Sequence, residues 1–223
     1  MSNKLDFSTI LASSVHDMKN SIGMMLFSID EMLAAEPENK ERLGQLHYDV
    51  LRVNNYLIQL MVLYKMDMEA YMFNVTEHEI YDFLLEQVAR NQSIISSKGI
   101  ETEIDADDMI IGYFDSSLIG GLVNNIVTNA VRYTDKKLRL SSYEEDGYVV
   151  IRIEDDGRGY PEQMLGDVSR FEWGVDFVSG STGFGLYFSS QVAQAHENDG
   201  KTGFVRLENG GALGGGVFSL YLP

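Results

Sequence analysis

Apolar residues recur every three or four positions through two stretches at the start of the chain. The first series has no gap and contains Leu11, Val15, Met18, Ile22, Met25, Ile29 and Met32. After a break that contains Pro37, the same spacing resumes with Leu43, Leu46, Val50, Val53, Leu57, Leu60 and Tyr64. This heptad spacing is typical of helices that pack along one seam. It predicts two helices, each roughly 35 Å long at about 1.5 Å per residue, that a short loop joins into an antiparallel hairpin.

A single hairpin of this kind would leave much of its apolar surface in contact with water. Two copies that pair into a four-helix bundle would cover that surface. The sequence therefore predicts a homodimer in which each protomer contributes a helical hairpin, residues 1–67.

The heptads stop at about Asp67, and the pattern beyond it is mixed. Helices are expected at Ile80 to Ile95, Ser116 to Tyr133 and Phe184 to His196. Strands are expected at Tyr71 to Val75, Ile100 to Asp105, Met109 to Phe114, Lys137 to Tyr143, Tyr148 to Asp155, Gly203 to Leu207 and Val217 to Leu222. Helices and strands interleave, but the expected hairpins make the sheet mixed. The prediction is an α+β protein of two domains, with a second domain at residues 68–223.

Composition narrows the possible partners. A chain of 223 residues can form two compact domains with cores of their own. Its 34 acidic and 17 basic residues give a net charge of -17, which disfavours nucleic acid and anionic membrane surfaces as partners. No stretch approaches the ~20 apolar residues of a membrane span, and Met1 to Phe7 lacks a signal-peptide pattern. We expect a soluble, cytoplasmic protein.

The chain contains no cysteine, which excludes disulfides, thiolate zinc sites and thiol nucleophiles together. Histidine is then the first candidate nucleophile. His16 follows the seam position Val15 and falls on the flank of its helix, where Asn20, four residues on, shares the same outward face. Asp17 is adjacent, and a carboxylate near an imidazole can fix its tautomer and raise its basicity. A plain surface histidine is the alternative interpretation of the same pattern.

Three further motifs lie in the second domain. Asn125 and Asn129 are four apart on one helix face, where amide oxygens can complete the coordination of a hydrated magnesium ion, although helix asparagines also serve as packing residues. Asp155 leaves a strand in Asp155-Asp156-Gly157-Arg158-Gly159, and its carboxylate could accept a hydrogen bond from an adenine amino group. The same letters also form common turns.

The third motif, Gly180-Ser181-Thr182-Gly183-Phe184-Gly185-Leu186, enters a helix. Glycines at a helix entrance expose backbone N–H groups to phosphate, helped by the positive end of the helix dipole. A lone pair of glycines has a high false-positive rate. Here, however, the motifs stand in a fixed order along the chain: histidine on a heptad hairpin, asparagine-rich helix, Asp-x-Gly-x-Gly, and glycines before a helix.

In that order the motifs resemble those of the sensor histidine kinases, over nearly the whole chain. His16 to Asn20 are similar to the family's H-box, Asn125 to Tyr133 to its N-box, Asp155 to Gly159 to its G1 box and Thr182 to Leu186 to its G2 box. The resemblance implies a dimerisation and phosphoacceptor hairpin. It also implies an α/β sandwich of the Bergerat type, shared with gyrase and Hsp90, which binds ATP.

The resemblance also assigns roles to residues. His16 would be the phosphoacceptor, Asp17 its acid-base partner and Asn20 the group that orients water in any phosphatase reaction. Asn129 would bind Mg²⁺, with Asn125 beside it, and Asp155 would bind adenine. Together, the nucleotide contacts implied by the motifs involve Asn125, Asn129, Arg132, Tyr133, Asp155, Gly157, Gly159, Thr182, Gly183, Gly185 and Leu186.

Some positions depart from the family pattern. Ser21 stands where the family often has proline, so the helix kink is missing. The segment between the two glycine boxes is short, and its phenylalanine is either Phe171 or Phe177. These departures bear on the reaction rate and on the segment that covers the nucleotide, the ATP lid, more than on ATP binding.

Three other functions fit part of the pattern. A gyrase-class ATPase would carry a glutamate as general base at the position of Asn125. Because this chain has asparagine there, hydrolysis of ATP by the chain alone is disfavoured. A serine kinase of the anti-sigma type would have no need of the heptad hairpin. A histidine phosphotransferase or scaffold that no longer binds ATP is the alternative that a nucleotide-binding assay would decide.

The family resemblance predicts the course of the reaction. A neutral ring nitrogen of His16 would attack the γ-phosphate of ATP, with Mg²⁺ offsetting charge and positioning doing most of the catalysis. The phosphohistidine would then donate to an aspartate in the receiver domain of a response regulator. Barely ten residues precede the first seam position, so we expect a separate sensor or regulatory protein to supply the input.

Overall fold

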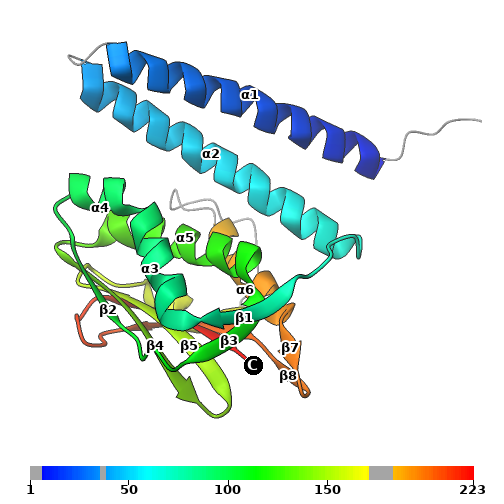
Figure 1. Ribbon diagram of the computed structural model, residues 1–223, viewed down its shortest axis with the longest axis vertical. Helices are drawn as coiled ribbons and strands as arrows, with labels where there is room; N and C mark the ends of the chain where they lie inside the picture. The colour runs from blue at the N-terminus through cyan, green and yellow to red at the C-terminus, as the bar shows by residue number, and fades with distance from the viewer. Residues whose placement is uncertain (1–6, 36–38, 171–182) are drawn as a thin grey trace, which may run out of the picture. The chain divides into compact units, whose positions relative to one another are not determined.

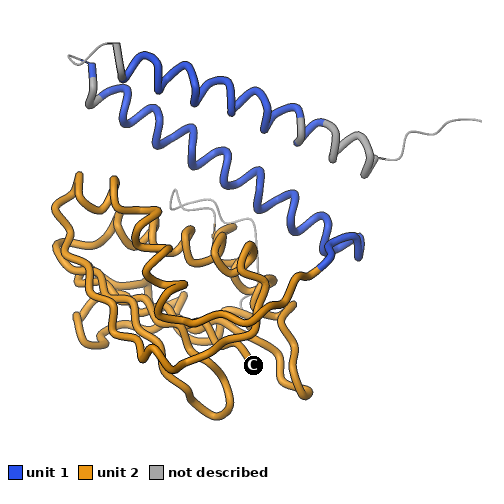
Figure 2. The backbone as a smooth tube through the Cα atoms, in the orientation of Figure 1, with its two compact units in different colours: residues 1–72 blue, residues 73–223 orange. Residues whose placement is uncertain are grey.

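The computed structural model describes residues 7–35, 39–170 and 183–223. The chain divides into two compact units, residues 1–72 and 73–223 (Figure 2). The sequence placed this boundary after residue 67, which is where the second helix ends. The first unit is helical and the second combines helices with a sheet.

The first unit is an antiparallel pair of helices (Figure 1). They are α1 (Phe7–Ala35) and α2 (Lys40–Asp67). His47 Nε2 on α2 lies 3.3 Å from Asp30 Oδ1 on α1, so a polar contact joins the two helices beside their apolar seam. Among the described residues, no helix is both long enough and apolar enough to span a membrane.

The seam of this hairpin is only half covered. On α1, Val15, Ile22 and Ile29 are buried, with 5–9% of their surface exposed. The seam positions between them are 49–55% exposed, and they are Met18, Met25 and Met32. On α2 the exposed seam positions are Leu46, Val53 and Leu60, at 38–49%. Alternate seam positions seven residues apart thus form one exposed apolar row on each helix, which we call the exposed rows.

The second unit interleaves strands and helices in the following order. Its first half contains β1 (Val75–Glu79), α3 (Ile80–Arg90), α4 (Gln92–Ser97), β2 (Glu101–Asp105), β3 (Ile111–Asp115) and α5 (Ser116–Tyr133). Its second half contains β4 (Lys137–Glu145), β5 (Tyr148–Asp155), β6 (Gly166–Asp167), α6 (Phe184–Gln194), β7 (Glu197–Asn198), β8 (Lys201–Thr202), β9 (Phe204–Asn209) and β10 (Gly216–Leu222).

Six strands form the main sheet, in the order β2-β4-β5-β10-β9-β6. The β2–β4 pair is parallel, and the other pairs are antiparallel, which confirms the predicted α+β fold with a mixed sheet. Helices α3, α5 and α6 lie over one face of this sheet (Figure 1). Strand β10 is buried along its whole length because it lies between β5 and β9.

Two predicted elements differ from the structure. The helix expected at Ile80 to Ile95 is broken at Asn91, whose Nδ2 donates to the carbonyl of Gln87 at 2.9 Å and to Asn124 Oδ1 at 2.9 Å. An asparagine side chain that bonds a backbone carbonyl in this way competes with the helix. The strand expected at Tyr71 to Val75 lies instead at β1, where it pairs with β3, a partner distant in sequence.

Helix α5 occupies the residues that the sequence predicted. Asp115 fixes its start, because its Oδ1 accepts from the N–H groups of Ser117 and Leu118 at 3.0 and 3.1 Å. Its Oδ2 accepts from the N–H of Asn74 at 3.0 Å, and the Asp115 N–H donates to His196 Nε2 at 3.1 Å. The beginning of the second unit, the start of α5 and the segment after α6 are therefore joined at one buried residue, Asp115.

Candidate functional site

Asp155 is the last residue of β5 and is 7% exposed. Its Oδ1 accepts hydrogen bonds from the N–H groups of Gly157 at 2.8 Å and Gly216 at 3.2 Å. Burial raises the pKa of this carboxyl, and the two backbone N–H groups oppose that rise. A buried carboxylate that keeps acceptor capacity is suited to a ligand that donates a hydrogen bond.

Glycines enclose Asp155. A Cβ on Gly215 would lie 2.6 Å from Asp155 Oδ1, and one on Gly216 would lie 2.8 Å from Asp155 Oδ2. A Cβ on Gly157 would overlap the carbonyl oxygen of Tyr133 at the end of α5. These contacts show why the motif requires glycine, since any side chain would push the backbone away from the carboxylate.

Tyr160 and Asn209 hold the next part of the same loop. Asn209 Oδ1 accepts from the N–H of Tyr160 at 2.6 Å, and its Nδ2 donates to the Tyr160 carbonyl at 2.8 Å. Gly159 has a φ of +76° and packs on the Asn209 side chain. The Tyr160 ring packs on Gly216, and burial, with the Asp155 charge, strongly raises the pKa of its hydroxyl.

Asp156 has a different role from its neighbour. Its Oδ1 accepts from the N–H groups of Asp135 and Lys136 at 3.0 and 2.9 Å, which fixes the segment between α5 and β4. Desolvation works against ionisation of this carboxyl, but the backbone N–H donors prevail and lower its pKa. Two adjacent carboxyls are therefore shifted in opposite directions by their surroundings.

Asn125 and Asn129 lie one turn apart on α5. Asn125 is 9% exposed, and its Nδ2 has no hydrogen-bond partner among the described residues. Gly185 of α6 packs directly against this amide, since a Cβ there would lie 2.5 Å from Nδ2. Asn129 is exposed. A buried amide donor without a partner is costly, which favours a polar ligand at this point.

The end of α5 gathers positive charge over an aromatic ring. The guanidinium carbons of Arg132 and Arg158 lie 5.7 and 5.1 Å from the ring centroid of Tyr133. Arg158 comes from the loop between Gly157 and Gly159, so α5 and this loop share one cationic corner. Such a corner is suited to an anionic ligand.

Gly183 is the N-cap residue of α6 and has the left-handed conformation, with a φ of +61°. Its carbonyl accepts from the N–H of Leu186 at 3.0 Å, and Leu186 is buried. Thr182, together with Phe171 and Phe177, lies outside the described residues. The structure thus brings the asparagine helix and parts of both glycine motifs together, with Gly185 against the middle of α5 at Asn125 and Gly157 against its C-terminal end at Tyr133.

The predicted phosphoacceptor lies in the other unit, on α1. His16 is four residues before Asn20 in one continuous helix, and Asp17 and Asn20 are exposed. The Asp17 carbonyl accepts from the Ser21 hydroxyl at 3.0 Å. The helix passes through Ser21 without interruption, as the missing proline led us to expect.

The sequence missed five residues of the site in the second unit. They are Arg158, Tyr160, Asn209, Gly215 and Gly216. The glycine-rich stretch before β10 was visible in the sequence, but only the pairing of β10 with β5 brings it to Asp155. Glycine contacts around a buried acceptor, a buried amide without a partner and a cationic corner together fit a purine nucleotide.

Comparisons with known proteins define the class first. Residues 114–223 match the family described as histidine kinase-, DNA gyrase B-, and HSP90-like ATPase. Sensor histidine kinase GraS of Staphylococcus haemolyticus is 26% identical over 188 residues, which cover 82% of this chain and 53% of that protein. Sensor histidine kinase CssS of Bacillus subtilis is 25% identical, over 87% of this chain and 44% of that protein.

Solved structures share the fold. Histidine kinase AdeS of Acinetobacter baumannii aligns with a TM-score of 0.62 at 18% identity, covering 93% of this chain and 96% of that one. Full-length ShkA, solved in complex with AMPPNP, aligns with a TM-score of 0.68 at 19% identity, covering 96% of this chain and 45% of that one. The chain belongs to the sensor histidine kinase family. It spans about half the length of the curated relatives it matches.

Proposed function

We propose that the chain is an ATP-dependent protein-histidine kinase that phosphorylates His16 and passes the phosphoryl group to an aspartate of a response regulator. The observations that carry this proposal are the glycine-enclosed carboxylate of Asp155, which lies beside the C-terminal end of α5, and the buried Asn125 amide on the same helix. A heptad hairpin with His16 in its first helix accompanies them in the same chain.

ATP is the nucleotide that these residues fit. The Asp155 carboxylate would accept a hydrogen bond from the adenine amino group, and Asn125, Arg132, Tyr133 and Arg158 would supply polar and cationic groups for the phosphates. Asn129 is exposed on the same helix and would bind Mg²⁺ through its amide oxygen. When bound, Mg²⁺ offsets negative charge on the transferred phosphoryl group. The chain's own contribution is to hold the nucleotide and to present His16 as the acceptor.

The exposed rows of the hairpin support a homodimer. Met18, Met25 and Met32 on α1 face solvent in the single chain, although they continue the seam of the buried positions. The matching row on α2 behaves in the same way. A second hairpin would cover both rows and complete a four-helix bundle. We therefore propose a dimer through residues 1–67.

A different face of α1 supports a protein partner. A shallow groove of about 690 Å³ is lined by Lys19, Asn20, Gly23, Met24, Phe27, Ser28 and Glu31. Met24 and Phe27 are 66% and 64% exposed, and neither belongs to the heptad seam. The groove begins within one turn of His16 on the same helix and extends to about four turns from it. It is suited to a receiver domain that must bring its aspartate close to a phosphohistidine.

Two further predictions belong to this proposal. We propose that the protein works in the cytoplasm, and that a separate sensor or regulatory protein supplies its input. Cell fractionation followed by crosslinking to the tagged chain tests both. Recovery of the chain in the cytoplasmic fraction, crosslinked to a sensory protein, would support both. Recovery in the membrane fraction, with no crosslinked protein, would contradict both.

The decisive experiment follows labelled phosphate onto the protein. The wild-type chain is incubated with ATP labelled at the γ-phosphate and with Mg²⁺, and phosphohistidine is located by mass spectrometry. His16→Gln should abolish acid-labile labelling and leave the dissociation constant for ATP within about twofold, because the acceptor and the nucleotide lie in different units. His47→Gln is the matched control and should label normally.

The alternative of a phosphotransferase or scaffold without nucleotide makes opposite predictions. Such a protein would show no calorimetric binding of ATP and would acquire label only from another phosphorylated protein. Acid-labile label that persists on His16→Gln would show that the acceptor is a different residue.

A further inference from the structure

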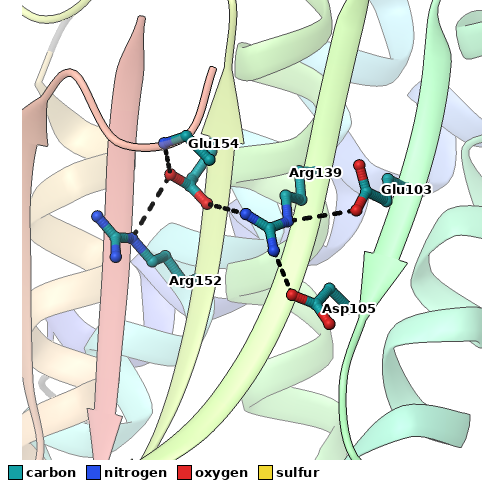
Figure 3. Close-up of polar contacts among 6 residues, drawn as sticks. Glu103, Asp105, Arg139, Arg152 and Glu154 are labelled. Carbon is teal, nitrogen blue, oxygen red and sulfur yellow. Dashed lines mark hydrogen bonds and ion pairs between the residues drawn. The ribbon is translucent and has the colours of Figure 1, made fainter. Parts of the chain in front are cut away.

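Glu154 is a buried charge on the sheet face opposite to Asp155. Consecutive residues of a strand point to opposite faces, so Glu154 and Asp155 at the end of β5 lie back to back. Glu154 is 3% exposed. Figure 3 shows its carboxylate between the side chains of Arg139 and Arg152, on the face away from the helices.

Two arginines and one backbone N–H surround this carboxylate. Its Oε2 lies 3.7 Å from Arg139 Nη1, and its Oε1 lies 3.9 Å from Arg152 Nε. Its Oε1 also accepts from the N–H of Ala212 at 2.9 Å. Arg139 is shared with Glu103 and Asp105 of β2, so the Glu154 carboxylate lies within a chain of charges that runs from Arg152 across the sheet to β2 (Figure 3). Burying a carboxylate is costly without such partners.

Ala212 belongs to the glycine-rich turn, residues 210–215, which joins β9 to β10. The turn is closed by hydrogen bonds from Gly210 N to Gly215 O at 2.8 Å and from Gly214 N to Gly210 O at 2.7 Å. Gly211 lies so close to Glu154 that a Cβ would overlap Oε1. Glu154 therefore binds this turn by one direct hydrogen bond and by close packing.

The same turn holds Asp155 from the other side. Gly215 N donates to the Asp155 carbonyl at 3.0 Å, and the next residue, Gly216, donates its N–H to Asp155 Oδ1 at 3.2 Å. Few of these backbone positions have side chains to pack, so the turn depends on hydrogen bonds to keep its conformation. By holding Ala212, Glu154 thus fixes the turn conformation in which the Gly216 N–H points at the Asp155 carboxylate.

We propose that Glu154 is a positioning residue for adenine recognition: it holds the glycine-rich turn from the outer face of the sheet and thereby orients the Asp155 carboxylate. This inference rests on the proposed role of Asp155 as the acceptor for the adenine amino group. It assigns a nucleotide-specificity function to a residue that does not touch the nucleotide.

The test compares two nucleotides that differ in one group. ATP carries the 6-amino group, and purine riboside 5′-triphosphate lacks it. Calorimetry with the full chain gives both dissociation constants for the wild type, Glu154→Leu and Glu154→Gln. Glu154→Leu removes the acceptor for Ala212 at similar volume, while Glu154→Gln keeps one acceptor oxygen. Glu208→Leu, an exposed glutamate on β9, is the matched control.

The expected result is selective. Glu154→Leu should weaken ATP binding by about tenfold, in line with a lost or misdirected hydrogen bond, and should change binding of the purine analogue by less than about twofold. Glu154→Gln should recover part of the loss, and Glu208→Leu should match the wild type. Retained binding of the analogue shows that each variant is folded.

Two results would overturn the inference. Equal loss of both nucleotides in Glu154→Leu would mean a structural role, and unchanged ATP affinity would mean no role. Failure of the proposed function gives a different result, because the wild type would then bind ATP and the analogue equally or bind neither.

Discussion

The two units of the chain differ in how completely they cover their apolar surface. In the hairpin, alternate positions of each seam are 38–55% exposed, whereas in the second unit the central strand β10 is buried along its whole length. The second unit also buries polar groups at particular points, Asp115, Glu154, Asp155 and His196 among them. The hairpin thus leaves apolar surface that the proposed dimer would cover, while the second unit completes its own core and places buried polar groups where elements join.

The largest expected effect comes from placing a charge in an exposed row. Met25→Lys should dissociate the dimer, because an unpaired ammonium in the four-helix core costs several kcal/mol, on the order of a hundredfold or more in the dimer dissociation constant. Sedimentation equilibrium measures the change. Met24→Lys is the matched control, since Met24 is its sequence neighbour, lies outside the seam and is 66% exposed.

Ile22 sharpens the same comparison. This seam position is already buried in the single hairpin, at 9% exposed, so Ile22→Lys should lower the helix content as well as dissociate the dimer. Circular dichroism separates the two variants. A wild-type chain that is monomeric at micromolar concentration, or a fully dimeric Met25→Lys, would mean that the exposed rows serve another partner.

The second effect is in the nucleotide unit alone. Asp155→Asn replaces a carboxylate acceptor by an amide, and the loss of a charge-assisted hydrogen bond of ~1.5–3 kcal/mol should weaken ATP binding by roughly tenfold to a hundredfold. The oligomeric state should not change. An unchanged dissociation constant by calorimetry would mean that Asp155 to Gly159 is only a turn.

A third prediction concerns the close packing around Asp155. Gly157→Ala would drive a methyl group into the Tyr133 carbonyl, and overpacking of this kind costs ~1–3 kcal/mol. We expect a lower melting temperature and weaker ATP binding. Gly121→Ala is the control on α5, where no atom lies within 4 Å of the new methyl group, and it should stabilise the helix slightly. Equal melting temperatures for the two variants would contradict the packing argument.

The smallest effect is a dependence on pH. Burial lowers the pKa of His196 below its ordinary value of 6.5, and its Nε2 accepts from the Asp115 N–H only when neutral. The unfolded chain therefore takes up the proton first, so the free energy of unfolding should fall as the pH drops below about 6.5 and should not depend on this group above it. The loss is on the order of 1 kcal/mol, the net value of one hydrogen bond.

Denaturant unfolding of the second unit at pH 7.5 and pH 5.5 measures this effect. His196→Gln keeps an acceptor but does not titrate in this range, so it should remove the His196 contribution to the difference. If the variant and the wild type lose the same free energy on acidification, the pH dependence comes from other groups.

Much of the second unit followed from local patterns. Helix α5 was predicted to the residue, and the structure shows that the Asp115 carboxylate caps its start. Elements that depend on distant partners were harder to place. Strand β1 lies four residues later than predicted because its position is set by pairing with β3, and Asn91 interrupts a regular helical pattern through a contact with Asn124.

The candidate site divides in the same way. Asp155, Gly157 and Asn125 were found from motifs that are local in the sequence. Glu154, Asn209 and Gly215 could not be found in this way, because their roles exist only when β10 lies between β5 and β9. In the hairpin, heptad spacing identified the seam, but the separation into buried and exposed rows required the packed helices.

The close packing of glycines around Asp155 has a consequence for how this protein can evolve. Gly157, Gly215 and Gly216 admit no side chain, so a saturation mutagenesis library selected for nucleotide binding should return almost only wild-type codons there. Variation in affinity would then arise one layer further out, at residues such as Asn209 and Glu154, which contact the backbone around Asp155. Residues that do not touch the nucleotide would then be the ones whose substitution changes its affinity during evolution.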